Sequence, residues 1–244
     1  MNDYAVDIRG LHYTYPDGTP ALRGVDLQLR QGLKGALVGR NGVGKSTLLL
    51  HLNGILRGQG AVRVLGQEVC STNLKSIRRK VGIVFQNPDD QLFALRVFDD
   101  VAYGPLDQDL TAQEVEARTH AALAAVRMTQ AADRPPHHLS FGERRRVSIA
   151  GVLAMKPELL ALDEPTGNLD PQGRRELIHL LQSLPVTQLI ATHDLEMVVE
   201  VCHLAFLMDA GQMVASGPPR ELLAQADLLL AHGLEPPLRL ALTR

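Results

Sequence analysis

Residues 39 to 47 form a glycine-rich stretch whose residue types and spacing suit phosphate binding. The stretch fits the pattern G-x-x-x-x-G-K-[ST] and reads Gly39-Arg40-Asn41-Gly42-Val43-Gly44-Lys45-Ser46-Thr47. Its glycines allow positive φ and a close approach of backbone N–H groups to phosphate oxygens. Lys45 adds a point charge toward the β- and γ-phosphates, and the Ser46 hydroxyl suits the octahedral shell of Mg²⁺. An apolar run precedes the stretch and leucines follow it, as a strand and a helix would, so we predict a P-loop.

Further polar residues follow apolar runs that are typical of buried strands. Residues 159–162 are apolar and lead directly into Asp163 and Glu164. Carboxylates at a strand end beside a P-loop are placed to bind Mg²⁺. A run at 81–85 ends at Gln86, and a run at 186–191 ends at Thr192-His193-Asp194.

The remaining patterns predict the elements that position these residues. Residues 5–38 alternate apolar and polar positions around a turn at Pro16-Asp17-Gly18, which predicts an antiparallel β start. The segment 87–155 has helical periodicity and two capping boxes, at Thr111–Glu114 and Ser140–Glu143. Beyond residue 217 we expect a leucine-rich helix and a proline-interrupted tail. We therefore predict an α/β fold with a helical insert.

Composition limits the possible functions. The 244 residues are 45 % apolar and 21 % charged, which is enough for one large core. A net charge of -2 gives no basic field for nucleic acid, so we expect no nucleic-acid partner. Cys70 and Cys202 lie far apart and form no zinc motif. The sequence has no 18-residue apolar run, and its start lacks the charged and apolar regions of an export signal, so we expect neither a membrane span nor export.

Taken together, six motifs in order resemble those of the ATP-binding-cassette (ABC) ATPases over about residues 5 to 217. They are the P-loop, Gln86 after a strand, a signature at Leu139-Ser140-Phe141-Gly142-Glu143, a Walker B strand at 159–164, a D-loop at Asn168-Leu169-Asp170, and the switch histidine His193. The resemblance implies an α/β P-loop NTPase core formed by residues 1–86 and 156–217, which includes an N-terminal antiparallel β subdomain. It also implies an inserted helical subdomain at 87–155 and a C-terminal helical tail at 218–244.

The same resemblance implies that the chain binds ATP and Mg²⁺ and hydrolyses ATP. Residues 39–47 would hold the phosphates, and Ser46, Gln86 and Asp163 would serve Mg²⁺, with Asp163 acting through water. Glu164 would polarise the attacking water, and His193 would contact the γ-phosphate. Tyr15 could stack on the purine, although a strand aromatic with only a packing role is the alternative.

ABC ATPases pack as head-to-tail dimers, and this implies that the signature acts on the partner's nucleotide. Ser140, Gly142 and Glu143 would then bind ATP in trans from a helix N-terminus. The second ATPase chain would be an identical copy or a close paralogue. Phe141 and Glu143 depart from the family's L-S-G-G-Q, which puts the tightness of dimer closure in doubt. We expect Phe141 to turn into the helical insert.

The runs 86–93 and 97–105 resemble the segment that energy-coupling-factor (ECF) ATPases place against their membrane partner. Asp89 and Asp90 would pair with the partner's arginines, while Leu92, Phe93 and Phe98 would form an apolar anchor. The stretch 139–157 resembles that of cobalt and nickel importers, with vitamin importers as the alternative. We thus expect a peripheral subunit at the cytoplasmic face of the cell membrane, bound to integral membrane transporter subunits.

Other classes of P-loop protein fit the sequence less well. A soluble ABC ATPase acting on DNA would carry a long coiled-coil insert, yet Lys45 and Asp163 are only 118 positions apart. One acting on ribosomes would carry two cassettes, and a P-loop kinase would lack the signature. The pair His137-His138 is a weak metal candidate. The basic clusters 78–80 and 144–146 are predicted to be mainly solvated surface, with contact to a dimer mate or a membrane partner as the alternative for the second.

Overall fold

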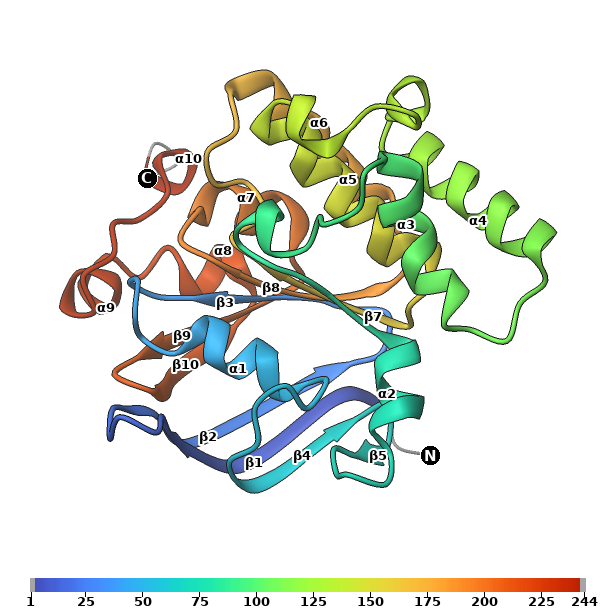
Figure 1. Cartoon of the computed structure of the whole chain (residues 1–244). Helices are drawn as coiled ribbons and strands as arrows, with labels where there is room; N and C mark the ends of the chain where they lie inside the picture. Colours follow the sequence, from blue (N-terminus) through green and yellow to red (C-terminus); the bar gives the residue numbers. More distant parts are fainter. Residues whose placement is uncertain (1–2, 242–244) are drawn as a thin grey trace.

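The computed structural model describes residues 3–241, which form two β-sheets with helices between and around them (Figure 1). The larger sheet has the strand order β10-β9-β3-β8-β7-β6, and the smaller one has the order β2-β1-β4-β5. Residues 1–2 and 242–244, which belong to the predicted core and tail, lie outside the described residues.

The larger sheet supplies the scaffold for the P-loop. Its strands are β3 (Lys34–Val38), β6 (Val81–Val84), β7 (Leu159–Asp163), β8 (Thr187–Thr192), β9 (Leu204–Asp209) and β10 (Gln212–Gly217). All pair in parallel except β10, which runs antiparallel to β9. Every residue of β3, β6, β7 and β8 is buried, because both faces of the sheet are covered.

The smaller sheet is antiparallel, as the alternating N-terminal pattern predicts. It consists of β1 (Tyr4–Thr14), β2 (Pro20–Arg30), β4 (Gln59–Val64) and β5 (Gln67–Glu68). Val25, Leu27 and Leu29 of β2 are buried. They share a core cluster with Leu48 and Leu49 of helix α1 (Lys45–His51), which lies between the two sheets (Figure 1).

Helix α2 (Leu74–Lys80) precedes β6. The stretch between β6 and β7 contains the helices α3 (Val97–Leu106), α4 (Ala112–Ala125) and α5 (Phe141–Ala154), which pack on one another. Both predicted capping boxes are present. Thr111 and Glu114 begin α4, and Ser140 and Glu143 begin α5. Each box satisfies free N–H groups of the first turn and so fixes where its helix begins.

Two helices follow the Walker B region, α6 (Pro171–Ser183) and α7 (Leu195–Val201), and Asp170 caps α6 as predicted. Beyond residue 217, where the sequence predicts a leucine-rich helix and a proline-interrupted tail, the chain forms three short helices. They are α8 (Pro219–Leu222), the leucine-rich α9 (Ala226–Ala231) and α10 (Leu238–Ala241). Gly233 adopts φ 69° after α9, and two prolines follow it, so the helix cannot continue.

Within residues 3–241, no helix combines the length and apolar character that crossing a bilayer requires. The same residues contain no group of three or more His, Cys, Asp or Glu side chains that could hold a metal ion.

Candidate active site

The register of the larger sheet brings four predicted site segments to one edge. Val38 of β3 pairs with Thr192 of β8, and Asp163 of β7 pairs with Ala191 of β8. On the other side of β7, Val84 of β6 pairs with Leu162. The carboxyl ends of these strands therefore align, so the P-loop, the switch histidine, the Walker B carboxylates and Gln86 emerge side by side.

The P-loop backbone has the conformation that its glycines permit. Gly42 and Gly44 adopt φ values of 82° and 106°, which lie in the left-handed region. A Cβ atom at Gly44 would lie 2.6 Å from the carbonyl oxygen of Ala21, so only glycine fits there. Lys45 is 5 % exposed, and its Nζ donates to the carbonyl oxygens of Gly39 at 2.8 Å and Arg40 at 3.0 Å. The ammonium group thus lies inside the loop that would surround a phosphate.

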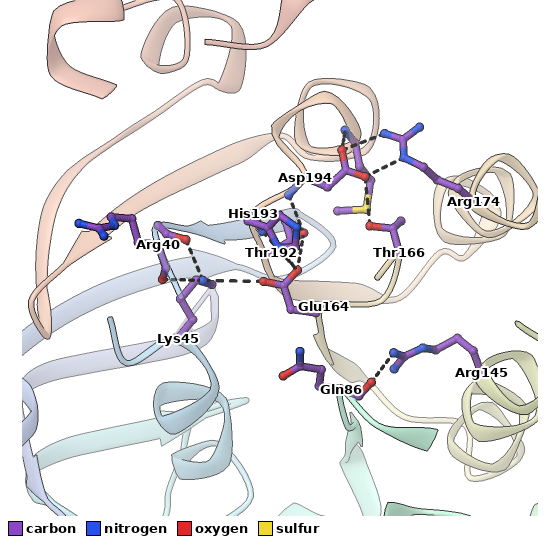
Figure 2. Close-up of polar contacts among 12 residues, drawn as sticks. Arg40, Lys45, Gln86, Arg145, Glu164, Thr166, Arg174, Thr192, His193 and Asp194 are labelled. Atoms are coloured by element: carbon purple, nitrogen blue, oxygen red, sulfur yellow. Dashed lines mark hydrogen bonds and ion pairs between the residues drawn. The ribbon is translucent and has the colours of Figure 1, made fainter. Parts of the chain in front are cut away.

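Glu164 stands at the centre of the polar contacts in Figure 2. Its Oε2 lies 2.9 Å from Nδ1 of His193 and accepts a hydrogen bond from the Thr192 hydroxyl at 3.1 Å, while Oε1 lies 3.8 Å from Nζ of Lys45. Glu164 is buried and has φ 43°, an unfavourable value for a residue with a side chain. Strain of this kind persists where surrounding contacts fix the residue, and it concentrates at functional sites.

Burial changes the ionisation of the site. Desolvation lowers the pKa of Lys45, although the carboxylates of Glu164 and Asp163 act against this change. Desolvation also raises the pKa of Asp163, with the neighbouring Glu164 adding to the rise. The Ser46 hydroxyl, Lys45 and Arg145 partly offset it. Asp163 and Glu164 are thus two neighbouring buried carboxylates, and Lys45 and Arg145 supply the positive charge near them.

These residues fit a divalent cation. Asp163 Oδ1 and Glu164 Oε1 are both buried and have no hydrogen-bond partner among the described residues. The nearby Ser46 hydroxyl limits the rise in the pKa of Asp163, so two of the residues predicted to serve Mg²⁺ are neighbours in the fold. Buried oxygen atoms without partners are costly, and a hard cation with oxygen ligands would satisfy them.

Tyr15 lies beside the P-loop helix. Its hydroxyl is 2.8 Å from Oγ1 of Thr47, and its ring packs edge-to-face on Tyr13 at 5.1 Å between centroids. This position next to the first turn of α1 suits a contact with the purine. It equally suits the alternative, in which Tyr15 is a strand aromatic that only packs against its neighbours.

The residues after the switch histidine form a network that the sequence did not reveal. Asp194 caps α7 by accepting from the Met197 amide at 3.0 Å, and it binds Arg174 of α6 at 2.7 and 2.8 Å. The Thr166 hydroxyl donates to the same carboxylate at 3.1 Å. Burial acts to raise the pKa of Asp194, but these hydrogen bonds together with the charge of Arg174 hold it below its usual value.

The signature residues lie away from the P-loop of the same chain. Ser140, Phe141 and Gly142 line a hollow of about 420 Å³ whose other walls include the D-loop residues Asn168 to Asp170, and none of residues 39–47 lines it. Ser140 is exposed at the N-terminus of α5. This chain thus presents its signature outward rather than to its own P-loop.

The two departures from the usual signature have local partners. The Glu143 carboxylate accepts from the Ser140 amide at 2.8 Å and lies 3.8 Å from Arg134, so its negative charge is bound within the helix cap. The Ser140 amide is also the main cause of the lowered pKa of Glu143. The Phe141 ring lies 5.5 Å from Cζ of Arg145, one turn further along the same helix, and Phe141 also lines the hollow beside the D-loop.

One expectation about charged residues is wrong, and another concerns a residue that has a partner within the chain. The sequence predicts mainly solvated surface for the basic cluster 144–146, but Arg145 is 1 % exposed. Arg145, Ser148, Ile149 and Val152 follow the buried spacing i, i+3, i+4, i+7, and this pattern could have placed the arginine inside. Asp89, which is predicted to pair with an arginine of a membrane partner, forms an ion pair at 2.9 Å with Arg144 of its own chain. Its side chain is 60 % exposed, and pairing with a partner stays a prediction.

Comparison with known proteins agrees with this geometry. Residues 22–167 match the family model described as ABC transporter. The chain is 46 % identical, over 95 % of its length and 76 % of the relative's, to an energy-coupling factor transporter ATP-binding protein EcfA of Methanothermobacter thermautotrophicus. It superposes on cbiO1 of Clostridium perfringens, described as part of the ABC transporter complex cbiONQ, with a TM-score of 0.83, 38 % identity and 99 % coverage of both chains.

A second solved structure is that of the ATP-binding cassette MJ0796, described as dimeric, in a post-hydrolysis state and bound to ADP and Pi. It matches with a TM-score of 0.80 and 25 % identity, covering 88 % of this chain and 98 % of that one. The predicted α/β P-loop NTPase fold with its antiparallel sheet is therefore confirmed. The chain belongs to the ABC transporter family and is an ATP-binding subunit with ATPase activity.

Proposed function

We propose that this chain is the ATPase of an ECF-type importer for cobalt or nickel ions. The observation that carries the proposal is the full-length similarity to cbiO1 at 38 % identity, together with the 46 % identity to an EcfA protein. A vitamin importer of the same type is the second candidate, because the EcfA name specifies no solute.

In this proposal each site residue has its own role in ATP hydrolysis. The P-loop residues 39–47 hold the phosphates of ATP, with Tyr15 at the purine. Ser46, Gln86 and Asp163 serve Mg²⁺, which neutralises charge on the phosphate oxygens when bound. Glu164 accepts a proton from the attacking water. His193, 2.9 Å from that carboxylate, holds it in place and contacts the γ-phosphate.

The signature is proposed to complete the nucleotide site of a second chain. Ser140, Gly142 and Glu143 stand at an outward-facing helix N-terminus, which favours anions. Their separation from the P-loop of the same chain and the dimeric state of MJ0796 support head-to-tail pairing. We also propose the domain division into a core of residues 1–86 and 156–217, a helical subdomain of residues 87–155 and a tail of residues 218–244.

An exposed apolar group on the helical segment is proposed to contact a membrane subunit. Phe93, Leu95 and Tyr103 are 68 %, 85 % and 61 % exposed, and the Phe93 and Tyr103 rings meet edge-to-face at 4.9 Å. Asp100 holds the loop in place by accepting from the amides of Phe93 and Ala94, both at 2.9 Å. Phe93, Tyr103 and Asp100 border a cavity of about 370 Å³ that Leu92 also lines. Prearranged aromatic side chains beside a pocket are typical of binding hot spots.

The anchor proposed here differs in part from the one that the sequence suggested. Phe98 packs partly buried against the core and 5.3 Å from His120, so Leu95 and Tyr103 take its place on the surface. Asp90 lines the same cavity and stays available to an arginine of the partner. Docking there would hold the chain at the cytoplasmic face of the cell membrane as a peripheral subunit.

Purification from a native host, followed by uptake assays, tests the proposal. A tagged chain should copurify with integral membrane proteins, and Phe93→Ala should weaken that association. Leu230→Ala serves as a control, because it removes another exposed apolar side chain on α9. Cells lacking the chain should lose uptake of labelled Co²⁺ or Ni²⁺, and the wild-type gene should restore it.

Glu164→Gln should still bind ATP and the membrane proteins but restore no uptake. Its turnover should be lower by roughly 10² to 10⁴, the range for loss of a positioned base. Normal metal uptake without the chain, accompanied by loss of a vitamin instead, would rule out the metal and leave the ECF assignment standing. Copurification with no membrane protein would rule out both.

A further inference from the structure

Arg145 is the largest fully buried side chain of the described residues, and the hydrolytic mechanism above gives it no role. It lies on α5, five positions after Ser140. Burial of a guanidinium is costly unless it is paired and hydrogen-bonded. Among residues 3–241, however, no carboxylate lies within ion-pair distance of it, and its Nε has no hydrogen-bond partner. The arrangement therefore calls for an explanation other than a salt bridge.

The two terminal nitrogens of Arg145 bind two successive backbone carbonyls. One donates to the carbonyl oxygen of Phe85 at 2.6 Å, and the other donates to that of Gln86. The planar fork of arginine matches this pair, whereas a lysine ammonium on its flexible stem would not hold the same spacing. Figure 2 shows the Gln86 side chain directed away from Arg145, on the side where Glu164 and Lys45 lie. Fixing the backbone at Gln86 thus fixes the starting point of its side chain.

Neighbouring contacts join the same segment to α5. Asp89 pairs with Arg144 at 2.9 Å, and Gln91 donates to the Ser148 carbonyl at 2.9 Å while accepting from the Phe85 amide at 3.3 Å. The segment 85–91 is therefore bound along one face of α5, with Arg145 as its buried centre. The Phe141 ring adds a cation–π contact to the same guanidinium, which connects it to the signature.

Asp163 and Glu164 lie close enough to stabilise the charge of Arg145. Desolvation lowers the pKa of the guanidinium, and both carboxylates act against that change. In return, Arg145 is one of the charges that limit the rise in the pKa of Asp163. Arg145 thus lies behind the site, near enough to influence it electrostatically but bonded only to the backbone.

We propose that Arg145 is a positioning residue that holds Gln86 in place for Mg²⁺ and ties that placement to the signature helix. The proposal rests on the assignment of Gln86 to the Mg²⁺ shell. Removing an outer partner of a metal ligand typically costs about 10- to 100-fold in metal affinity or activity. Lysine at position 145 keeps the positive charge near Asp163, so Arg145→Lys should act through Gln86, and this distinguishes Arg145 from a residue that merely stabilises the fold.

A double-mutant cycle on the full-length chain tests this. The readout is the Mg²⁺ concentration that gives half-maximal ATP hydrolysis, and binding of a fluorescent ATP analogue in EDTA is measured alongside. Arg145→Lys should raise the half-maximal Mg²⁺ concentration about tenfold and leave metal-free nucleotide binding unchanged. Gln86→Ala should raise it similarly, and the double variant should show no further rise, because both changes remove one interaction. Arg118→Lys, on a half-buried arginine of α4 that donates to Gln108, is the matched control and should change nothing.

Two results would overturn the proposal. Equal effects of Arg145→Lys in the wild-type and Gln86→Ala backgrounds would show that Arg145 does not act through Gln86. An unchanged Mg²⁺ requirement in Gln86→Ala would also contradict the proposal, because Gln86 would then have no part in Mg²⁺ binding. Gln86 is exposed, so this result does not depend on whether a variant of the buried Arg145 folds. A wild-type chain with no Mg²⁺-dependent hydrolysis would instead contradict the proposed function, so the two failures are distinguishable.

Discussion

At the scale of single residues, the buried carboxyl of Asp163 makes the stability of the folded chain depend on pH. Burial raises the pKa of this carboxyl, so the folded state binds its proton more tightly than the unfolded state. Its stabilising contribution is present below the ordinary aspartate pKa of about 3.9, and it is lost as pH rises through the raised value. At neutral pH, without nucleotide and Mg²⁺, the ionised carboxylate therefore destabilises the chain.

Asp163→Asn should consequently melt at a higher temperature than the wild type at pH 8 in EDTA. Each kcal/mol gained corresponds to about 2–4 °C in a chain of this size, and the gain should shrink as pH falls toward 4. With Mg²⁺ and ATP the order should reverse, because only the wild type gains stability from binding both. Differential scanning fluorimetry at several pH values measures this. Asp227→Asn, an exposed carboxylate on α9, is the control. An equal or lower melting temperature for Asp163→Asn at pH 8 would contradict the argument.

Residue-level contacts were only partly predictable from the sequence. The P-loop and the strand-end carboxylates follow from short patterns with a clear mechanism, and the structure brings them together. The left-handed backbone of Glu164 and the Asp194–Arg174 pair depend on chain segments far apart in sequence, so no local pattern encodes them. Arg145 was placed on the surface because three adjacent arginines suggest solvent, although its helical position indicated burial.

At the scale of elements, the helix starts were the most predictable features, because a cap is a local interaction. The capping boxes of α4 and α5 and the Asp170 cap of α6 all appear where the sequence placed them. The tail was not predictable, since its short helices are set by leucines that pack on the core rather than by a continuous periodic pattern.

The contact between α6 and α7 gives an element-scale prediction. Arg174 and Asp194 join these helices at 2.7 and 2.8 Å next to the switch histidine. Arg174→Met should destabilise the chain by about 1–2 kcal/mol, because it leaves a mostly buried carboxylate without its main partner. That loss corresponds to roughly 2–8 °C in melting temperature.

The pH dependence of this loss identifies its cause. The pKa of Asp194 is lowered in the folded state, so its stabilisation is present above the ordinary aspartate pKa and is lost as pH falls through the lowered value. The difference between wild type and variant should be constant from about pH 8 to pH 5 and should shrink below about pH 4. Arg175→Met changes the exposed neighbour on the same helix and should have little effect. A difference that persists at pH 3 would point to lost packing rather than lost charge.

At the scale of the whole molecule, the chain carries a P-loop and a signature segment but keeps them apart. Lys45 is buried in the P-loop, while Ser140 faces outward from α5 toward a hollow shared with the D-loop. A phosphate bound at the P-loop would meet the positive end of the α5 helix only if a second chain supplied it. In a symmetric head-to-tail dimer each chain would then contribute to both sites.

Mixing two inactive chains tests this arrangement. A Lys45→Ala chain lacks the P-loop charge, and a Ser140→Arg chain places a bulky group where the γ-phosphate would bind. In a head-to-tail mixed dimer, one site contains both lesions and the other contains neither. Random pairing makes half of the dimers mixed, each with one intact site, so up to about a quarter of the wild-type ATPase activity should return. A mixture of Lys45→Ala and Glu164→Gln chains is the matched control. Lys45 and Glu164 both act on the nucleotide bound to their own chain, so each of the two sites in a mixed dimer carries one lesion and no activity should return. If tagged chains prove that mixed dimers form and the first mixture stays as inactive as the control, Ser140 does not act on the partner's nucleotide.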